Sequence, residues 1–341
     1  MKKIAIIGAG SWGTALSIVL SHSRSPHSIC LWAHEQEVIS SLRETRSNSL
    51  FLSGEMVPNS VEITGDVAHA VKDAAIVLGV MPSQHARSLY MQIFKHAGPE
   101  AIVVSATKGL EPDTLLRMTQ VIAQAAEKSS PKDGATRAPR IAVLSGPSFA
   151  REVARGDPTS IVAASEDADI AEEVQEEFAG PTFRPYTNSD VIGVELAGSV
   201  KNVIAIAAGV TEGLGLGHNT LAALITRGLA EITRLSIALG GRRETMAGLA
   251  GIGDLVLTCT GALSRNRHVG VELGKGRPLQ EILDSTRMVA EGVPTTAAAR
   301  TLARQLSIEM PITEQMYDVL HNGRSSQDAV RNLMDRRLTV E

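Results

Sequence analysis

One lysine near the middle of the chain stands where a charge is hard to accommodate. Lys201 lies in the stretch 191–209, which is otherwise almost entirely small and apolar. If this stretch is a helix, the residues on the same face are Val194, Ala197, Gly198, Ile204, Ala205 and Ala208. Burial lowers the pKa of a lysine, and that lets lysine act as an acid or base near neutral pH. The alternative is a lysine that extends along a helix edge to water.

A glycine motif at the start of the chain indicates a second chemical site. Gly8, Gly10 and Gly13 form G-x-G-x-x-G between the apolar run Lys2–Ile7 and the helical pattern 14–20. In that setting the first glycine makes a tight turn, the second lets backbone approach a pyrophosphate, and the third lets helix pack on strand. The N–H groups at the helix start then face an anion. The motif predicts a dinucleotide site, with an incidental glycine turn as the alternative.

The end of the second predicted strand bears on the choice between NAD and NADP. An NAD site usually has an acidic residue at this position, on the adenine ribose. Here Ala33 and His34 follow the strand Ser28–Trp32, and Glu35 comes just after them. His34 could help to hold a 2′-phosphate, which favours NADP or dual use, while Glu35 keeps NAD open.

The composition fits a two-domain enzyme. A length of 341 residues is enough for about two domains with sizeable cores. The net charge is −4 and the basic residues are spread along the chain, so the sequence gives no sign of a surface that binds nucleic acid. Two cysteines are too few for a disulfide framework and suit a reducing cytoplasm. No signal peptide, membrane span or metal-ligand set is predicted, since the apolar stretch 191–209 carries Glu195, Lys201 and Asn202.

Strand and helix patterns alternate through the first half and then give way to helices. Strands are expected at Lys2–Ile7, Ser28–Trp32, Val61–Thr64, Ala75–Val80, Ala101–Ala106, Ile141–Ser145, Thr159–Ala164 and Thr182–Tyr186. Such alternation predicts an α/β fold: a Rossmann-type, doubly wound, mostly parallel sheet in residues 1–188. Residues 189–341 are expected to form an all-helical substrate-binding domain, and 129–139 a polar surface loop without an assigned role.

Polar segments follow the strands at the edge where ligands bind in such sheets. Lys108 follows the fifth predicted strand, and Gly146 and Ser148 follow the sixth. Ser148 either caps the next helix or helps to bind a substrate oxygen. In the helical half, Asp254 is either a helix cap or a partner for a cation. Arg265 and Asn266 together could clamp a phosphate, because guanidinium offers paired donors and the amide adds another.

Several of these runs resemble one family over nearly the whole chain. They are Gly8–Ala15, Ala106–Glu111, Ser145–Ala150, Gly198–Gly209, Ile225–Glu231, Gly251–Cys259 and Ser264–Arg267. The chain resembles bacterial NAD(P)-dependent glycerol-3-phosphate dehydrogenase, from residue 4 to about 313. One departure is Ala290, where many members carry a valine before the glutamate; the flanking residues stay in place.

The resemblance implies roles for individual residues. Lys201 matches the general acid/base. Substrate-site positions are matched by Lys108, Gly146, Ser148, Lys201, Asn202, Asp254, Thr258, Ser264, Arg265 and Asn266. Cofactor contacts, including the glycine turn, are matched by Gly8, Gly10, Ser11, Trp12, Gly13, His34, Lys108, Ala150, Arg265, Val289 and Glu291. The resemblance also implies NADP or NAD as cofactor, a phosphorylated small-molecule substrate, a role in phospholipid synthesis and a homodimer.

The implied reaction is the reversible reduction of dihydroxyacetone phosphate to sn-glycerol 3-phosphate. Lys201 would give a proton to the carbonyl oxygen, and Asp254 would orient the ammonium. Three alternatives share parts of this pattern. A β-hydroxyacid dehydrogenase would favour G-x-x-G-x-G and lack the run Ser264–Asn266. A ketopantoate- or opine-type reductase would lack the Arg265–Asn266 clamp, and a non-catalytic dinucleotide sensor would need neither Lys201 nor Asp254.

The strand end at residue 32 generates a prediction about the cofactor. Because Ala33 and His34 stand where an acidic residue is usual, we expect NADPH to support reduction of dihydroxyacetone phosphate at least as well as NADH. Parallel assays with the two cofactors measure this. A preference for NADH of more than about tenfold (~1.4 kcal/mol) would show that Glu35 reaches the ribose instead.

Overall fold

The chain folds into two compact units. The computed structural model describes residues 1–129 and 138–337, so most of the polar segment 129–139 lies outside the described residues. Unit 1 comprises Met1–Glu111 and Leu116–Glu195, and unit 2 comprises Pro112–Leu115 and Leu196–Glu341. The division falls inside helix α8 (Val191–Gly213). The start of this helix is tied into unit 1, because the buried Glu195 carboxylate accepts a hydrogen bond from the backbone N–H of Thr119 at 2.8 Å.

Unit 1 is built on one eight-stranded sheet with the order β10-β9-β8-β7-β6-β1-β2-β5. Its strands are β1 (Lys2–Ile7), β2 (His27–Trp32), β5 (Val61–Thr64), β6 (Ile76–Gly79), β7 (Ile102–Ser105), β8 (Arg140–Ser145), β9 (Thr159–Ala164) and β10 (Phe183–Asn188). A separate antiparallel pair joins β3 (Ser47–Asn48) to β4 (Leu52–Met56). Neighbouring strands of the large sheet are parallel except β8 and β9, so the mostly parallel sheet is confirmed, with β9 and β10 reversed.

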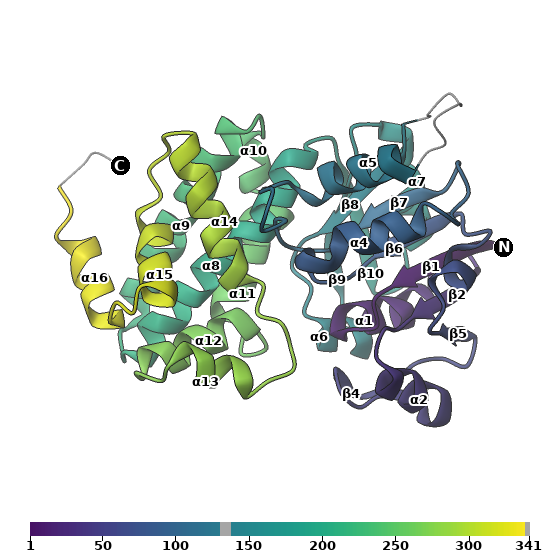
Figure 1. The fold of residues 1–341 in the computed structure, drawn as a ribbon, viewed down its shortest axis with the longest axis horizontal. Coiled ribbons are helices and arrows are strands. Elements are labelled where there is room, and N and C mark those ends of the chain that lie inside the picture. The colour runs from purple at the N-terminus through teal and green to yellow at the C-terminus, as the bar shows by residue number, and fades with distance from the viewer. Residues whose placement is uncertain (130–137, 338–341) are drawn as a thin grey trace. The chain divides into compact units, whose positions relative to one another are not determined.

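Helices cover both faces of this sheet (Figure 1). They are α1 (Ser11–Leu20), α2 (Gln36–Thr45), α3 (Val67–Val71), α4 (Ser83–Ile93), α5 (Met118–Ser129), α6 (Ala150–Arg155) and α7 (Ala168–Phe178). Alternate residues of β1 point to opposite faces. Ile4 and Ile6 belong to the core shared with α1, α6 and α7, whereas Ala5 and Ile7 belong to the core shared with α3, α4 and α5. Continuous apolar strands are therefore explained by burial on both faces.

The order of the parallel strands brings several polar segments to one edge. β8, β7, β6 and β1 are neighbours and parallel, so their carboxyl ends meet at the same edge. The glycine turn after Ile7, the segment after Gly79, Lys108 and Ser148 all follow these ends. This is the edge where open parallel sheets bind ligands.

Unit 2 is helical. It contains most of α8 and then α9 (His218–Ala238), α10 (Arg243–Met246), a π-helical turn η1 (Leu249–Gly253), α11 (Asp254–Thr260), α12 (Arg265–Gly274), α13 (Leu279–Asp284), α14 (Gly292–Gln305), α15 (Pro311–His321) and α16 (Ser326–Met334). α8 is its core helix. Among the helices that the structure describes, α8 alone is long and apolar enough by itself to cross a membrane, but 94% of its most apolar window is buried in the protein. A bent pair, 243–260 with 265–274, passes that test only if counted as one span.

Glycines let α8 and α12 approach until their backbones touch. A Cβ atom at Gly209 would overlap the carbonyl oxygen of Arg267, and one at Gly270 would overlap that of Ile206. Gly213 and Gly274 form a second such contact one turn further along. No larger residue fits at these crossings, so the glycine pairs fix the position of α12 on α8. The first turn of α12 is held near the middle of α8 as a result.

A buried carboxylate holds the start of α15. Glu231, on α9, is 1% exposed and accepts hydrogen bonds from the backbone N–H groups of Ile312 (2.6 Å) and Thr313 (3.2 Å) and from the Thr313 hydroxyl (3.0 Å). Burial raises the pKa of Glu231 to about 7, although these three donors act in the opposite direction. The first N–H groups of α15 thus receive their acceptor from another helix.

This carboxylate should make stability depend on pH. The folded protein keeps a proton on Glu231 between about pH 4.5 and 7, where the unfolded chain loses it, so the free energy of unfolding falls as pH rises through that range. We expect a loss of up to about 3 kcal/mol from this group. Urea unfolding of the wild type and Glu231→Gln at pH 5, 6, 7 and 8 isolates it, because Gln does not titrate. Equal pH slopes for the two proteins would contradict the prediction.

Candidate active site

The glycine turn of unit 1 has the geometry that its spacing predicts. Gly8 has φ +122°, which residues with a Cβ rarely adopt, and a Cβ there would overlap the carbonyl oxygen of Val80. A Cβ at Gly13 would overlap the carbonyl oxygen of Gly8, so this glycine is needed for α1 to pack against the turn. Gly10 differs from both, since nothing lies within 4 Å of the place its Cβ would occupy. Backbone is therefore exposed at Gly10, where a ligand can approach it.

The start of α1 leaves room for an anion. Gly10 occupies the N-cap position and contributes no side-chain hydrogen bond. The first N–H groups of a helix lack partners within the helix, and together with the helix dipole they favour negative charge. The Trp12 indole N–H, beside the turn, is buried without a hydrogen-bond partner among the described residues. The turn, the uncapped helix start and this orphan donor fit the pyrophosphate end of a dinucleotide.

A buried asparagine that was not predicted from the sequence braces the same turn. The Asn48 amide donates to the carbonyl oxygen of Ala9 and to the Thr14 hydroxyl, both at 2.8 Å. Its oxygen accepts from the backbone N–H of Phe51 at 3.1 Å, and the Ser11 hydroxyl donates to the Phe51 carbonyl at 2.8 Å. The β3–β4 connection is thereby fastened against the glycine turn. Asn48 lies in a polar run that looks like an ordinary turn, so the sequence carried no signal for this role.

The end of β2 presents both residues that bear on cofactor choice. Ala33 is buried, whereas His34 and Glu35 are exposed, and Glu35 occupies the N-cap position of α2. The His34 ring lies 6.0 Å from the ring of Trp32, centroid to centroid. His34 and Glu35 therefore lie at the end of the strand, where the adenine ribose is expected.

Lys108 is joined to the segment after β8. Its ammonium donates to the carbonyl oxygen of Gly146 at 2.9 Å and, over a longer distance of 3.5 Å, to the Ser148 hydroxyl. Ser148 itself donates to the Gly146 carbonyl at 2.9 Å. The helix-cap interpretation of Ser148 is wrong, because α6 starts at Ala150 with Phe149 in the N-cap position. Its hydroxyl belongs to the lysine group instead.

Lys201 is buried in unit 2 and paired. The residue is 5% exposed, and its ammonium donates to a carboxylate oxygen of Asp254 at 2.8 Å and to the Thr258 hydroxyl at 2.7 Å. Thr258 in turn donates to the backbone carbonyl of Asp254, one helical turn earlier, at 2.6 Å. Asp254 and Thr258 are 1% and 4% exposed. The interpretation of Lys201 as a lysine reaching along a helix edge to water is therefore wrong.

A backbone kink places Asp254 opposite the lysine. η1 contains a non-helical residue, Gly251, and a Cβ there would overlap the carbonyl oxygen of Met246. α11 begins directly after this turn, with Gly253 as its N-cap and Asp254 in its first turn. The Asp254 side chain is bonded to Lys201 and Thr258, so it is not a helix cap.

Cys259, one of the two cysteines of the chain, is fully buried next to this cluster. Burial raises the pKa of the Cys259 thiol to about 12, with the Lys201 ammonium opposing the shift. A thiol of this kind is protonated at neutral pH and is a poor nucleophile. Lys201, Asp254 and Thr258 are therefore the polar groups here that can do chemistry.

A second polar network joins three helices. The Asn266 amide donates to the side-chain oxygen of Asn202 at 2.9 Å, and its own oxygen accepts from the backbone N–H of Gly292 at 2.9 Å. Asn202 and Asn266 are 5% and 9% exposed. The network ties α8, α12 and the start of α14 together at Asn202, the residue that follows Lys201 in α8. Part of the hydrogen-bonding capacity of Asn266 is thus used within the protein.

The remaining predicted residues surround the start of α12. Ser264 caps this helix, its hydroxyl accepting from the backbone N–H of Arg267 at 3.2 Å. Arg265 is exposed at the first helical position. Partial desolvation lowers the pKa of the Arg265 guanidinium and the Glu291 carboxylate raises it, so Glu291 lies within its electrostatic reach. Val289 and Glu291 lead directly into α14.

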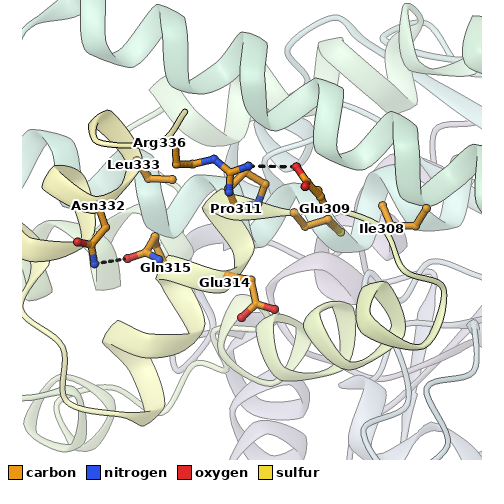
Figure 2. A pocket seen from close by; sticks show the side chains of 9 residues that line it. Ile308, Glu309, Pro311, Glu314, Gln315, Asn332, Leu333 and Arg336 are labelled. Atoms are coloured by element: carbon orange, nitrogen blue, oxygen red, sulfur yellow. Dashed lines mark hydrogen bonds and ion pairs between the residues drawn. The ribbon is translucent and has the colours of Figure 1, made fainter. Parts of the chain in front are cut away.

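A pocket elsewhere in unit 2 contains none of the predicted residues. It lies between α15, α16 and the segment that precedes α15 (Figure 2). Its polar side chains already have partners: Arg336 donates to Glu309 at 3.1 Å, the Asn332 amide donates to Gln315 at 3.3 Å, and Glu314 accepts from Arg300 at 2.7 Å. The Lys108 group in unit 1 and the Lys201 cluster in unit 2 are therefore the stronger candidates for functional residues.

Two models of one protein family match most of the chain. Models of the N-terminal and C-terminal parts of NAD-dependent glycerol-3-phosphate dehydrogenase match residues 3–171 and 190–331. The chain belongs to this family. A glycerol-3-phosphate dehydrogenase (NAD(P)+) of Koribacter versatilis is 58% identical over 342 residues, which cover 100% of this chain and 99% of the relative. The resemblance and the fold class inferred from the sequence are both confirmed.

Solved structures separate the family from its architectural neighbours. The glycerol-3-phosphate dehydrogenase of Coxiella burnetii superposes with a TM-score of 0.91 at 38% identity, covering 98% of this chain and 99% of that one. A ketopantoate reductase of Ralstonia eutropha reaches a TM-score of 0.58 at 16% identity, covering 96% and 99%. That likeness shows a shared fold alone. Membership in the glycerol-3-phosphate dehydrogenase family therefore argues against the ketopantoate-type and β-hydroxyacid alternatives.

Proposed function

We propose that this chain is an NAD(P)H-dependent sn-glycerol-3-phosphate dehydrogenase that reversibly reduces dihydroxyacetone phosphate. The single observation that carries the mechanism is the buried Lys201–Asp254–Thr258 cluster. The Asp254 carboxylate compensates the charge of the Lys201 ammonium inside an apolar helix bundle, and two hydrogen bonds hold its Nζ atom in one place. A fixed, protonated, water-shielded ammonium is suited to donate a proton to a carbonyl oxygen as negative charge develops on it.

Most of the residues that would hold the cofactor belong to unit 1. The backbone at Gly8, Gly10 and Gly13 and the start of α1, with Ser11 and Trp12, would bind the pyrophosphate. His34 and Glu35 would lie at the adenine ribose, and Ala150, Val289 and Glu291 are the further contacts implied by the family. When bound, the reduced nicotinamide supplies the hydride that the ketone carbon accepts. The protein residues orient the two reactants and manage one proton.

The phosphate of the substrate would bind at the start of α12. Arg265 offers a charge-assisted pair of donors, and Asn266 is held beside it by Asn202 and Gly292. Ser264 supports this arrangement by capping the helix that carries Arg265. Lys108, Gly146 and Ser148 would bind the remaining oxygens of the substrate. Contacts far from the reacting carbon then hold the ketone in line for reaction.

The setting of the enzyme is proposed on chemical grounds. Its product is the phosphorylated glycerol from which phospholipids are built, so we propose that it supplies phospholipid synthesis. Two buried, unpaired cysteines suit a reducing compartment, so we propose a cytoplasmic location. From the family resemblance we also propose a homodimer.

Substitution of Lys201 tests the proton step. Lys201→Arg keeps the positive charge beside Asp254, so we expect the fold to survive. Turnover should nevertheless fall by at least about 10²–10⁴, because guanidinium does not release its proton. Steady-state kinetics and thermal unfolding of the same variant measure both effects. The exposed Lys275→Met serves as the control and should be near normal in both.

A second variant removes both charges. Lys201→Met alone would leave the Asp254 carboxylate buried without its cation, which costs about 3–5 kcal/mol. The double change Lys201→Met with Asp254→Asn avoids that charge and should fold without turnover. If Lys201 served only to neutralise Asp254, the arginine variant would remain active, and that result would end the mechanism.

Substitution of Arg265 tests the phosphate site. Arg265→Ala should raise the Michaelis constant for dihydroxyacetone phosphate by the equivalent of ~1.5–3 kcal/mol, since it removes a charge-assisted pair. The weak reduction of unphosphorylated dihydroxyacetone should hardly change. Arg277→Ala, in the turn that follows the same helix, is the matched control. Equal losses on both substrates would instead assign Arg265 to the cofactor or to the fold.

A further inference from the structure

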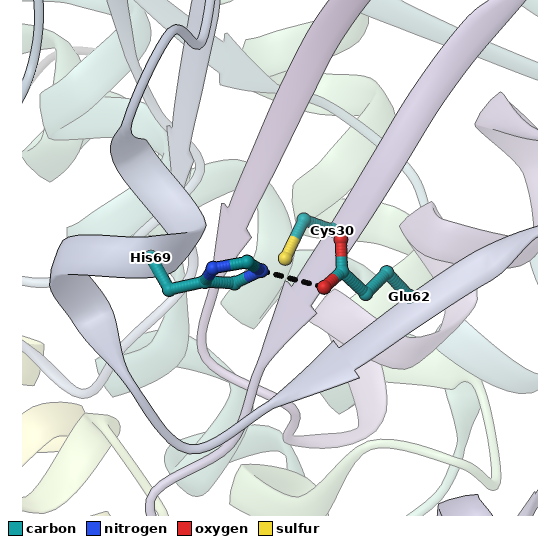
Figure 3. Close-up of side chains that lie close together, drawn as sticks. All are labelled: Cys30, Glu62 and His69. Atoms are coloured by element: carbon teal, nitrogen blue, oxygen red, sulfur yellow. Dashed lines mark hydrogen bonds and ion pairs between the residues drawn. The ribbon is translucent and has the colours of Figure 1, made fainter.

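Three side chains that can bind a metal gather at the sheet of unit 1, and none of them is among the residues assigned to the reaction. Cys30 of β2, Glu62 of β5 and His69 of α3 point toward one another (Figure 3). One ligand atom from each, the thiol sulfur, a carboxylate oxygen and an imidazole nitrogen, lies within 4.8 Å of the other two. The His69 Nε2 and Glu62 Oε1 atoms are already 2.6 Å apart.

The fold holds these three groups in place. Cys30 and Glu62 are register partners on the adjacent parallel strands β2 and β5, so their side chains leave the sheet on the same face. His69 comes from the short helix that follows β5, and Asp66 caps that helix by accepting from the backbone N–H of Ala68 at 2.9 Å. The Lys3 ammonium fastens the same helix to β1 through the carbonyl oxygens of His69 (3.0 Å) and Lys72 (2.8 Å). The backbone positions of the three residues are therefore fixed by the fold.

Their burial suits an ion that enters from solvent. Cys30 is 1% exposed and lies in the apolar core beneath α3, whereas about half of the His69 and Glu62 side chains is exposed. An ion could reach the two outer ligands first and then the sulfur. The two outer side chains can also rotate, which matters because ligands around one tetrahedral ion stand roughly 3.5 Å apart.

We propose that Cys30, Glu62 and His69 form a binding site for a zinc-class divalent cation, with water as the fourth ligand. Thiolate, imidazole and carboxylate together are a borderline-soft donor set that suits Zn²⁺ and does not suit Mg²⁺ or Ca²⁺. Burial raises the pKa of the Cys30 thiol to about 12, as it does for Cys259, so the ion itself must displace the thiol proton, which leaves to solvent. Thiolate, carboxylate and a doubly charged cation then sum to zero, so no isolated charge is buried.

This site is independent of the proposed dehydrogenase reaction. It joins β2, β5 and α3, and its expected effect is to stabilise that edge of the sheet. All three ligands belong to unit 1, and the test measures metal binding. The test therefore does not depend on substrate or on turnover. Failure of the metal site would leave the dehydrogenase proposal untouched.

Cobalt binding to the untagged full-length chain tests the proposal. Co²⁺ bound by a thiolate gives a charge-transfer absorption in the near ultraviolet, and tetrahedral ligation gives strong visible bands. We expect both, at about one Co²⁺ per chain, with displacement by Zn²⁺. Cys30→Ser should abolish the near-ultraviolet band. Glu62→Gln and His69→Gln should each weaken Zn²⁺ binding by about tenfold or more.

Matched controls use the other residues of the same kinds. Cys259→Ser removes the second of the two cysteines in the chain, and His96→Gln removes an exposed histidine; neither should change metal binding. Zn²⁺ should raise the unfolding temperature of these controls and of the wild type, but not of Cys30→Ser. The surface variant His69→Gln keeps the test decisive if Cys30→Ser folds poorly. No stoichiometric binding, or a thiolate band that survives Cys30→Ser, would overturn the proposal and leave a hydrogen-bonded group at the sheet.

Discussion

The helical unit depends on making one buried charge tolerable. An ammonium that is 5% exposed destabilises a fold unless a carboxylate and hydrogen-bond acceptors surround it. Asp254 supplies the charge and Thr258 the second acceptor, and both require α11 to start at a defined point opposite α8. The η1 kink at Gly251 sets that point. The glycine contacts between α8 and α12 then bring the residues proposed to bind phosphate close to α8. Packing and proposed chemistry thus share one set of constraints.

The same principle, a buried polar group with assigned partners, organises the nucleotide-binding unit. Strand order alone brings the ends of β1, β6, β7 and β8 to one edge. It does not fix the loops there; side-chain bonds do. Asn48 holds the glycine turn, and Lys108 holds the segment around Gly146 and Ser148. Glu231 plays the corresponding part for α15 in the other unit. Such side-chain bonds, and not the strand order, keep these segments in shape.

Features set by local pattern could be predicted from the sequence, and features set by distant partners could not. The apolar strands, the glycine turn and a lysine within an apolar helix are visible in short windows, and the structure has them where expected. The role of Asn48 depends on Ala9 and Thr14, which are far away in the chain, and nothing near Asn48 points to them. Ser148 looks like a helix cap because the helix start is uncertain by a residue or two. The reversal of β9 and β10 is likewise decided by pairing rather than by composition.

The Lys201–Asp254 pair contains a tension that bears on how the proposed reaction proceeds. The carboxylate that makes burial possible also stabilises the charged ammonium, and so it opposes release of the proton. A neutral ketone oxygen is too weak a base to take that proton. The oxygen becomes strongly basic only as the carbon accepts the hydride, when negative charge collects on it. The proton should therefore move after hydride transfer or together with it, and not to a ketone that is not being reduced. Asp254 then has two roles with one physical cause: it lets Lys201 be buried, and it makes proton donation conditional on the reduction itself.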